Sequence, residues 1–184
     1  MNIHSNKGKE KMRKIIIGFT TMLSIAMATP NIQNSVVLES EKGSLLDGSA
    51  WKSSTLQGKI SVLVYVDPDT SSDNEIWEDM TKEADFFQYK NFQSIAMINM
   101  AATWSPDFAI NLILENKKSN FPKTIYVRDL KKELVHTWGL SDDAYNILLI
   151  NEKGELLLHS DSTLSKLETE AFINTVITLL KETK

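Results

Sequence analysis

The segment Ile60–Val66, with the sequence ISVLVYV, constrains the fold more than any other part of this chain. It is an almost unbroken apolar run rich in β-branched residues, which is typical of a strand buried on both faces at the centre of a sheet. Before it, Asp47-Gly48 indicates a hairpin turn, and Gly58-Lys59 leads into the strand. We therefore expect an α/β protein with layers packed on both sides of this strand.

Two helical patterns alternate with strands after this segment. Ser72 and Glu75 form a capping-box pattern that predicts the start of a helix. The apolar positions of that helix recur at helical spacing and are Ile76, Trp77, Met80, Ala84 and Phe87. Residues 94–100 then predict a second strand, and Ser105-Pro106 begins another helix. That helix carries Phe108, Leu112 and Ile113. The order strand, helix, strand, helix predicts a parallel pair with its crossover.

The last third of the chain predicts shorter elements. Residues 124–127 and 134–138 are short strand candidates, and residues 146–150 and 156–159 are joined by a connection that only an antiparallel hairpin allows. Ser165 and Glu168 cap a final helix. Its apolar stripe is Phe172, Ile173, Val176, Ile177 and Leu180. The pattern predicts a thioredoxin-like three-layer fold: a mixed central sheet with an N-terminal βαβ unit, a C-terminal β-hairpin and a closing helix.

The first 28 residues differ in composition from the rest. A basic opening precedes a largely apolar stretch at 15–25, which is shorter than the roughly 20 residues of a spanning helix. Ala26-Met27-Ala28 places small residues where a signal peptidase reads. We expect a cleaved signal peptide at 1–28, a polar lead-in at 29–42 and one domain at 43–184, in a periplasmic or otherwise exported protein. An uncleaved amphipathic anchor is the alternative, and no membrane span is expected after cleavage.

Charge and the absence of cysteine exclude several activities. Residues 29–184 hold 15 basic and 23 acidic side chains, a net charge near −8, which repels nucleic acid. The chain has no Cys, so it cannot form a disulfide, a thiolate nucleophile or a Cys-ligated metal centre. His136 and His159, the only His residues outside the first 28, fall in predicted strands without metal-ligand spacing. We expect no cofactor and no metal.

Several motifs carry a resemblance to a known family. Asp47-Gly48, Trp51, Leu56, Gly58-Lys59 and the VLVYV strand resemble the start of extracytoplasmic thioredoxin-like proteins of the TlpA and peroxiredoxin types. The motifs that resemble the YtfJ-type family of exported proteins are Ala102-Thr103-Trp104, Pro122, residues 124–129, Trp138-Gly139-Leu140 and the NEKG hairpin. The resemblance covers residues 43–180 and implies a thioredoxin fold without a secure biochemical function.

The chain departs from active thioredoxins at both parts of their redox site. Those enzymes carry a C-x-x-C motif after the first core strand, where a helix N-terminus lowers the thiol pKa. The matching stretch here is Thr70-Ser71-Ser72-Asp73. They also carry a cis-proline before the hairpin, and the matching positions here are Ala144 and Tyr145. Thiol-disulfide exchange and Cys-based peroxide reduction are therefore excluded on chemical grounds.

An aspartate pair after the first core strand supports a different class of function. Asp67 and Asp69 stand where a Mg²⁺-dependent haloacid-dehalogenase-type phosphatase has its nucleophile and its acid-base group. Asp142-Asp143 could supply the second acidic pair and Lys123 the phosphate-neutralising charge. That fold requires an all-parallel sheet, so the direction of the strand at 146–150 decides between the two classes.

Calcium binding is a third possibility for the same loop. Six residues between 67 and 78 fall at the ligand offsets of an EF-hand, and they are Asp67, Asp69, Ser71, Asp73, Glu75 and Glu78. The loop lacks the mid-loop Gly, has Pro in its second position and follows a strand instead of a helix. Helix capping and favourable charge at the helix N-terminus explain the same residues.

The sequence thus favours a binding or accessory module without catalytic residues. We expect Trp51 and Trp77 to pack in the interior. Ligand sites of α/β sheets lie beyond the carboxyl ends of the parallel strands. A contact patch for an envelope protein or a small ligand is therefore expected there, formed by Asp67, Asp69, Thr70, Trp104 and Tyr145. Its carboxylates and aromatic rings suit a basic or aromatic partner surface. The alternative is that Trp104 and Tyr145 turn inward and pack the loops.

Overall fold

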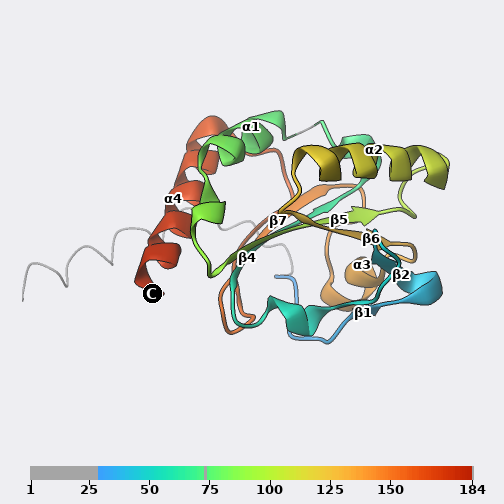
Figure 1. The fold of residues 1–184 in the computed structure, drawn as a ribbon, viewed down its shortest axis with the longest axis horizontal. Helices are drawn as coiled ribbons and strands as arrows, with labels where there is room; N and C mark the ends of the chain where they lie inside the picture. Colours follow the sequence, from blue (N-terminus) through green and yellow to red (C-terminus); the bar gives the residue numbers. More distant parts are fainter. Residues whose placement is uncertain (1–28, 73, 184) are drawn as a thin grey trace, which may run out of the picture.

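The computed structural model describes residues 29–72 and 74–183. A six-stranded sheet in the order β2-β6-β5-β4-β7-β8 forms its centre, and a two-stranded sheet of β1 and β3 lies beside it (Figure 1). The strands are β1 (Val37–Leu38), β2 (Gly43–Leu45), β3 (Trp51–Lys52), β4 (Ile60–Val66), β5 (Phe92–Asn99), β6 (Ile125–Asp129), β7 (Tyr145–Ile150) and β8 (Leu156–Ser160). The α-helices are α1 (Glu75–Glu83), α2 (Asp107–Asn120), α3 (Glu133–Trp138) and α4 (Lys166–Glu182).

Strand directions confirm the predicted thioredoxin-like fold. β4, β5 and β6 are mutually parallel neighbours, and α1 and α2 are the crossovers between them. β7 pairs antiparallel with β4, and β8 pairs antiparallel with β7. The all-parallel sheet that a haloacid-dehalogenase-type phosphatase requires is therefore absent from the six strands of this sheet.

The central sheet carries apolar clusters on both faces, one on the side of α3 and two on the side of α1, α2 and α4. Leu63 and Tyr65 point toward the layer formed by α3, β1 and β3. Val62 and Val66 point toward the opposite layer, which α1, α2 and α4 form (Figure 1). This alternation follows from the period of two in a strand, and both sides are buried as the apolar run predicted. Trp51 and Trp77 are buried on opposite faces, which confirms their packing roles.

The prediction of a strand at residues 134–138 is wrong, because this segment forms the short helix α3. Asp129 at the end of β6 is buried, and its carboxylate accepts hydrogen bonds from the amides of Lys131, Glu133 and Leu134. These amides have no partner within the helix, so the carboxylate favours a helix start at this point. His136 therefore lies in a helix, whereas His159 lies in β8 as expected.

Both crossover helices are present, with differences from the prediction. Helix α1 begins after Asn74 and not after Ser72, so the predicted capping box with Glu75 does not form. Helix α2 begins after Pro106, close to the predicted position. Its buried positions are Ile110 and Leu114. The apolar residues that marked the helix in the sequence, Phe108, Leu112 and Ile113, are exposed.

The segment that precedes the predicted domain packs against the fold. The Asn31 amide donates to the Trp138 carbonyl at 2.8 Å, and the Trp138 indole N–H donates to the Asn34 carbonyl at 2.8 Å. Ile32 and Val36 are buried in the same core as Trp138. The packed structure thus begins before residue 43. The predicted signal peptide at 1–28 lies outside the described residues. Within the part of the chain that the structure describes, no helix has the length and apolar character to cross a membrane.

Candidate functional site

Three loops meet at the carboxyl edge of the parallel strands, as the sequence predicted. The chain leaves β4 through a short 3₁₀ turn at Pro68–Thr70, and the Asp67 side chain caps this turn by accepting a hydrogen bond from the Asp69 amide at 2.9 Å. The Asp67 amide donates to the Ala144 carbonyl before β7 at 3.2 Å. In the loop after β5, the Thr103 hydroxyl donates to the Asp69 carboxylate at 2.9 Å. The edge is therefore held together by hydrogen bonds from all three loops.

The residues of the predicted contact patch divide between surface and core. Trp104 is 89% exposed, and Asp69 is exposed beside its loop. Thr70 is half-buried, and its hydroxyl donates to the Asp67 carbonyl at 3.2 Å. Asp67 and Tyr145 are only 4% and 6% exposed, and Tyr145 packs in the core beneath α1 and α4. Trp104 and Asp69 can therefore reach a partner, whereas Tyr145 supports the loops from within.

Several carboxylates lie close together at this edge, and the pKa values of two of them, Asp67 and Asp142, are shifted. Burial raises the pKa of Asp67, and the carboxylates of Asp69, Asp143 and Asp142 raise it further, against the Asp69 amide hydrogen bond that lowers it. Burial also acts to raise the pKa of Asp142, but hydrogen bonds from the Lys132 amine and the Asn99 amide outweigh this and leave the pKa below its usual value. The Lys132 amine lies 2.6 Å from the Asp142 carboxylate, so Asp142 is held as an ion-pair partner.

Neither rival chemistry is supported at this edge. Lys123, the expected phosphate-neutralising residue, places its amine 5.5 Å from the ring centre of Phe87. Asp142 is engaged by Lys132 and Asn99, as described above. The Asp67 carboxylate accepts a hydrogen bond from the Asp69 amide within the turn, and the Asp69 carboxylate accepts one from the Thr103 hydroxyl in the loop after β5. Among the described residues there is no group of three His, Asp or Glu side chains arranged to hold a metal ion. Nothing here favours the phosphatase or the calcium alternative.

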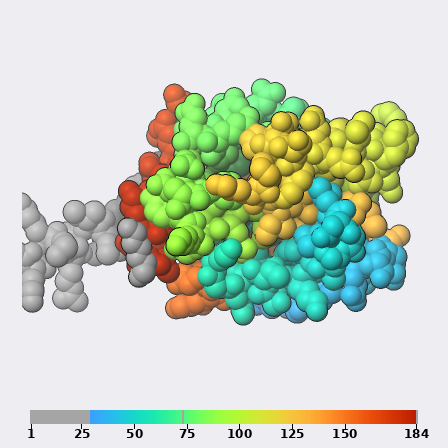
Figure 2. Space-filling model, in the orientation of Figure 1, coloured from blue at the N-terminus to red at the C-terminus, as the bar shows by residue number. Residues whose placement is uncertain are grey.

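A groove that the sequence analysis missed opens between α1 and α2. It has a volume of about 440 Å³ and lies over the sheet face formed by β4, β5 and β6. The apolar side chains of its floor come from alternate strand positions: Val62, Val64, Val66, Ala96, Ile98 and Tyr126. Its walls include Trp77 from α1 and Ile110 and Leu114 from α2. In the space-filling view the green residues after α1 and the yellow residues after α2 lie against each other at this face (Figure 2).

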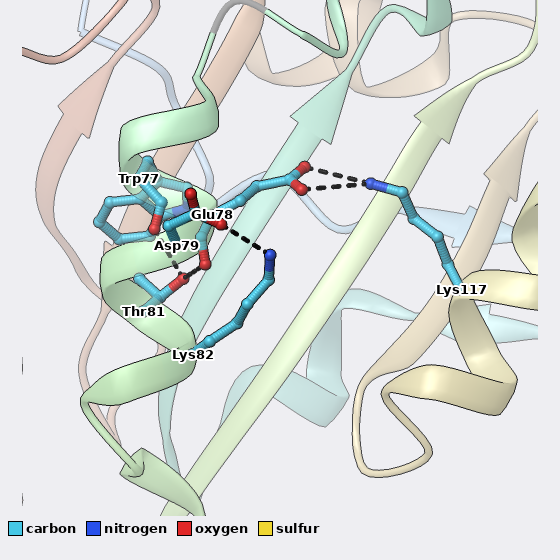
Figure 3. Close-up of polar contacts among 6 residues, drawn as sticks. All are labelled: Trp77, Glu78, Asp79, Thr81, Lys82 and Lys117. Carbon is cyan, nitrogen blue, oxygen red and sulfur yellow. Dashed lines mark hydrogen bonds and ion pairs between the residues drawn. The ribbon is translucent and has the colours of Figure 1, made fainter.

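The charged side chains that line this groove are Asp69, Glu78, Lys82, Asp85 and Lys117. Glu78 of α1 and Lys117 of α2 point toward each other across the strands, with an amine-to-carboxylate distance of 3.1 Å (Figure 3). Lys82 also reaches inward from α1 while pairing with Asp79 at 2.9 Å (Figure 3). Burial, and then the nearby Glu78 carboxylate, raise the pKa of Tyr145, which keeps its hydroxyl protonated. An apolar cavity with a few convergent polar groups is the usual form of a small-molecule site.

Two signals in the sequence could have indicated this side of the molecule. Ser94 and Ala96 place small side chains on the face of β5 that looks toward the helices, which leaves room beneath them. Phe108 and Leu112 are four residues apart and form a second apolar stripe on α2 in addition to Ile110 and Leu114, and Trp104 precedes them at the same spacing in the sequence. A helix with apolar residues on two sides has more apolar surface than the sheet beneath it can cover.

The fold and the edge together define a class: a thioredoxin-fold protein without the thiols of thioredoxin. A family model described as "Bacterial protein of unknown function (YtfJ_HI0045)" matches residues 26–183. The chain belongs to this family, which confirms the resemblance seen in the sequence. A search of curated proteins finds no match.

Solved structures show the same fold at low sequence identity. A putative thiol:disulfide interchange protein DsbE from Chlorobium tepidum is 15% identical, with a TM-score of 0.59 over 84% of this chain and 99% of that one. The thioredoxin domain of a thiol-disulfide oxidoreductase from Bacteroides vulgatus is 16% identical, with a TM-score of 0.58 over 84% and 99%. Yeast Sco1 is 12% identical, with a TM-score of 0.55 over 85% and 99%. These likenesses establish the fold alone.

Proposed function

We propose that this protein is an exported binding or accessory module that uses the thioredoxin fold to present a contact surface. The absence of Cys removes the redox chemistry of the fold, while the loops at the carboxyl edge remain tied together. The signal-peptide pattern of residues 1–28 supports export to the periplasm or beyond. The proposed partner is an envelope protein, for the reasons that follow.

The contact surface consists of Phe108 and Leu112 on α2 and of Trp104 in the loop before it. We call this surface the outer face of α2. The side chains of Phe108, Leu112 and Trp104 are 75%, 68% and 89% exposed. Residues four apart lie on one side of a helix, so Phe108 and Leu112 form one stripe. Trp104 adds an exposed ring in the loop that precedes the helix. Clustered exposed apolar side chains mark interaction sites, and Trp is enriched among residues that dominate binding energy. The exposure of Trp104 on a hydrogen-bonded loop is the observation on which the proposal rests.

The charges around this face indicate the chemistry of the partner. Asp69, Asp107 and Glu115 are exposed beside the stripe, and the region after residue 28 carries a net charge near −8. Apolar contact framed by carboxylates complements a segment that carries Leu-type side chains together with Lys or Arg. We therefore assign the partner as a basic amphipathic polypeptide segment. This surface retains Asp69 and Trp104 of the patch expected from the sequence, and it leaves Asp67, Thr70 and Tyr145 as supports.

The test uses a synthetic amphipathic helix of Leu and Lys, together with the same peptide carrying Glu in place of Lys. We expect the full chain to bind the Lys peptide in fluorescence anisotropy and not the Glu peptide. The double variant Trp104→Ala, Phe108→Ala should weaken binding at least about tenfold, because hot-spot side chains each contribute more than about 1 kcal/mol. Leu167→Ala removes a side chain that is 74% exposed on α4 and serves as the matched control.

Both variants should retain the melting temperature, because every side chain removed is largely exposed. Equal binding of the two peptides, or the same loss in Leu167→Ala as in the double variant, would contradict the assignment of α2 and of a basic partner.

A further inference from the structure

We propose that the groove between α1 and α2 binds one long-chain carboxylate, a free fatty acid, with its chain on the sheet and its head among lysines. This site is separate from the outer face of α2 and does not depend on the partner proposed above. Three features of the groove support the proposal: its lining, its size and the charges at its two ends.

The floor of the groove suits a hydrocarbon chain. β4 and β5 present Val62, Val64, Ala96 and Ile98 to it, and none of these side chains has a polar atom. Trp77 closes one wall. Covering this surface with an alkyl chain removes apolar area from water, which is favourable by about 25 cal/mol for each Å².

The size of the groove favours a single chain. Its volume of about 440 Å³ is at the lower end of the range of about 300 to 1,000 Å³ that small-molecule sites occupy. Ser94 and Ala96 create this space, because larger side chains at these two positions would fill it. A phospholipid with two chains requires more room, so we assign a free fatty acid and not a membrane lipid.

Lys82 lines one end of the groove, and Lys118 and Lys123 lie beside it, over aromatic rings of its lining, where they supply the site for the head. Three lysine amines lie over aromatic rings that line the groove: Lys82 is 5.8 Å from the ring centre of Phe121, Lys118 is 5.8 Å from that of Tyr126, and Lys123 is 5.5 Å from that of Phe87. Within the described residues, the amines of Lys118 and Lys123 have no carboxylate within ion-pair distance. The Lys118 amine donates to the carbonyls of Pro122 and Thr124, at 2.7 and 2.9 Å, and keeps its third N–H for an incoming anion, which Lys123 can also pair with.

The opposite end of the groove sets the direction of the ligand. Asp69 lines that end, and Asp67 stands directly behind it at the carboxyl edge of the sheet. These carboxylates repel a negative head. Asp85 lines the groove next to Phe86 and Phe87, but Lys82, Lys118 and Lys123 outnumber it there, so the lysine end attracts the head. The carboxylate is therefore expected near Lys118 and Lys123, with the chain extending toward Trp77 and the carboxyl ends of β4 and β5.

The experiment measures binding of oleate to the full chain by isothermal titration calorimetry. Oleyl alcohol, oleylamine and phosphatidylglycerol vesicles are compared under the same conditions. Ala96→Leu and, separately, Ser94→Leu fill the floor of the groove, and Ala171→Leu makes the same kind of addition on the exposed surface of α4 as a control. The double variant Lys118→Gln, Lys123→Gln neutralises the head site, and Lys166→Gln, Lys181→Gln on α4 is its charge-matched control.

We expect saturable binding of one oleate, weaker binding of the alcohol and the amine, and no comparable binding of vesicles. Either filling variant should weaken oleate binding by about tenfold or more, since blocking a few buried methylenes costs over about 1.4 kcal/mol. The Lys118 and Lys123 double variant should weaken it by about three- to tenfold, while both controls bind as the native chain does. Circular dichroism melts confirm that each variant is folded.

Several results would overturn the proposal. They are the absence of saturable oleate binding, binding of the alcohol or the amine as tight as that of oleate, binding to vesicles alone, or unchanged affinity in a folded filling variant. Binding of the Lys and Leu peptide to α2 is expected to continue in Ala96→Leu, so failure of this site can be distinguished from failure of the proposed partner surface.

Discussion

The two faces of the central sheet differ in how completely they are covered. On the face of α3, the side chains of Leu38, Leu63 and Trp138 are almost fully removed from water. On the opposite face, a groove separates α1 from α2, and Phe108 and Leu112 point into solvent. Apolar surface that a fold leaves uncovered usually serves binding. The comparison supports the proposal made above that one face provides stability while the other provides contact surfaces.

The chain segments that cover each face account for the difference. We call the side of the sheet that α3 covers the sealed face, and the side of α1, α2 and α4 the open face. The N-terminal segment adds Ile32 and Val36 to the sealed face. The Trp138 indole ties this segment down by donating a hydrogen bond to the Asn34 carbonyl. On the open face, α4 buries five residues, whereas α2, with 14 residues, buries only Ile110 and Leu114. The open face is therefore well packed near α4 and loosely covered near α2.

The largest expected effect is the loss of stability when the sealed face is damaged. Trp138→Ala should lower the free energy of unfolding by about 3–5 kcal/mol, because it leaves a cavity in a packed core. It also removes the edge-to-face contact with Trp51, whose ring centre lies 6.4 Å away. Phe108→Ala, on the open face, should change it by less than about 0.5 kcal/mol. Urea unfolding measures both, and equal losses in the two variants would show that the faces do not differ as described.

Most of the fold could be predicted from the sequence, because its strongest signals are periodic. The apolar run of β4 identified the central strand, and the short connection at Asn151 to Gly154 required the antiparallel hairpin. Ser165 and Glu168 form the capping box that was predicted for α4. These features depend on neighbouring residues alone, so they can be read without knowing the tertiary contacts.

The errors arose where individual side-chain hydrogen bonds decide the local structure. Residues 134–138 are helical because Asp129, several residues earlier, binds the first free amides of α3. The start of α1 depends on Asn74, whose side chain accepts a hydrogen bond from the distant amide of Leu164 at 2.9 Å. The spacing of apolar residues, on which the predictions were based, shows neither interaction.

The candidate site could be predicted only in part for a similar reason. The rule for parallel strands correctly brought the loops of Asp69 and Thr103 together. It could not tell that Trp104 points outward while Tyr145 points inward, because side-chain direction depends on how α1 and α2 are placed. The groove follows from the gap between two helices, and no single segment of the sequence encodes that gap.

A smaller effect is expected from the ion pair that connects α1 to α2. Glu78 and Lys117 form the one ion pair between these helices within the described residues, and their side chains are 33% and 43% exposed. A double-mutant cycle with Glu78→Gln and Lys117→Met should give a coupling of about 0.2–1 kcal/mol, since exposed pairs are screened by solvent. The coupling should fall in 1 M NaCl. A coupling that salt does not change would mean that the two side chains interact by packing alone, and that the ion pair does not join the walls of the groove.

The smallest expected effect is a gain in stability at the carboxyl edge, where Asp67→Asn removes a buried charge. The pKa of Asp67 is raised in the folded protein by burial and by neighbouring carboxylates, so the native state binds its proton more tightly than the unfolded state does. The contribution of this residue to the free energy of unfolding therefore falls as the pH rises above 3.8, the ordinary pKa of Asp. This loss of stability is complete once the pH exceeds the raised pKa that Asp67 has in the folded protein. An amide oxygen at position 67 can still accept the hydrogen bond from the Asp69 amide.

Asp67→Asn should therefore melt at a slightly higher temperature than the native chain at pH 7, and this difference should disappear as the pH approaches 3.8. Thermal unfolding followed by circular dichroism from pH 3.5 to 8 measures it. Glu170→Gln, at an exposed position on α4, is the control for removing one negative charge from an acidic protein. An equal gain in both variants would mean that net charge, and not the burial of Asp67, causes the effect. A gain confined to Asp67→Asn would show that this edge of the sheet retains a carboxylate at a cost in stability, as expected where binding and not packing has shaped the sequence.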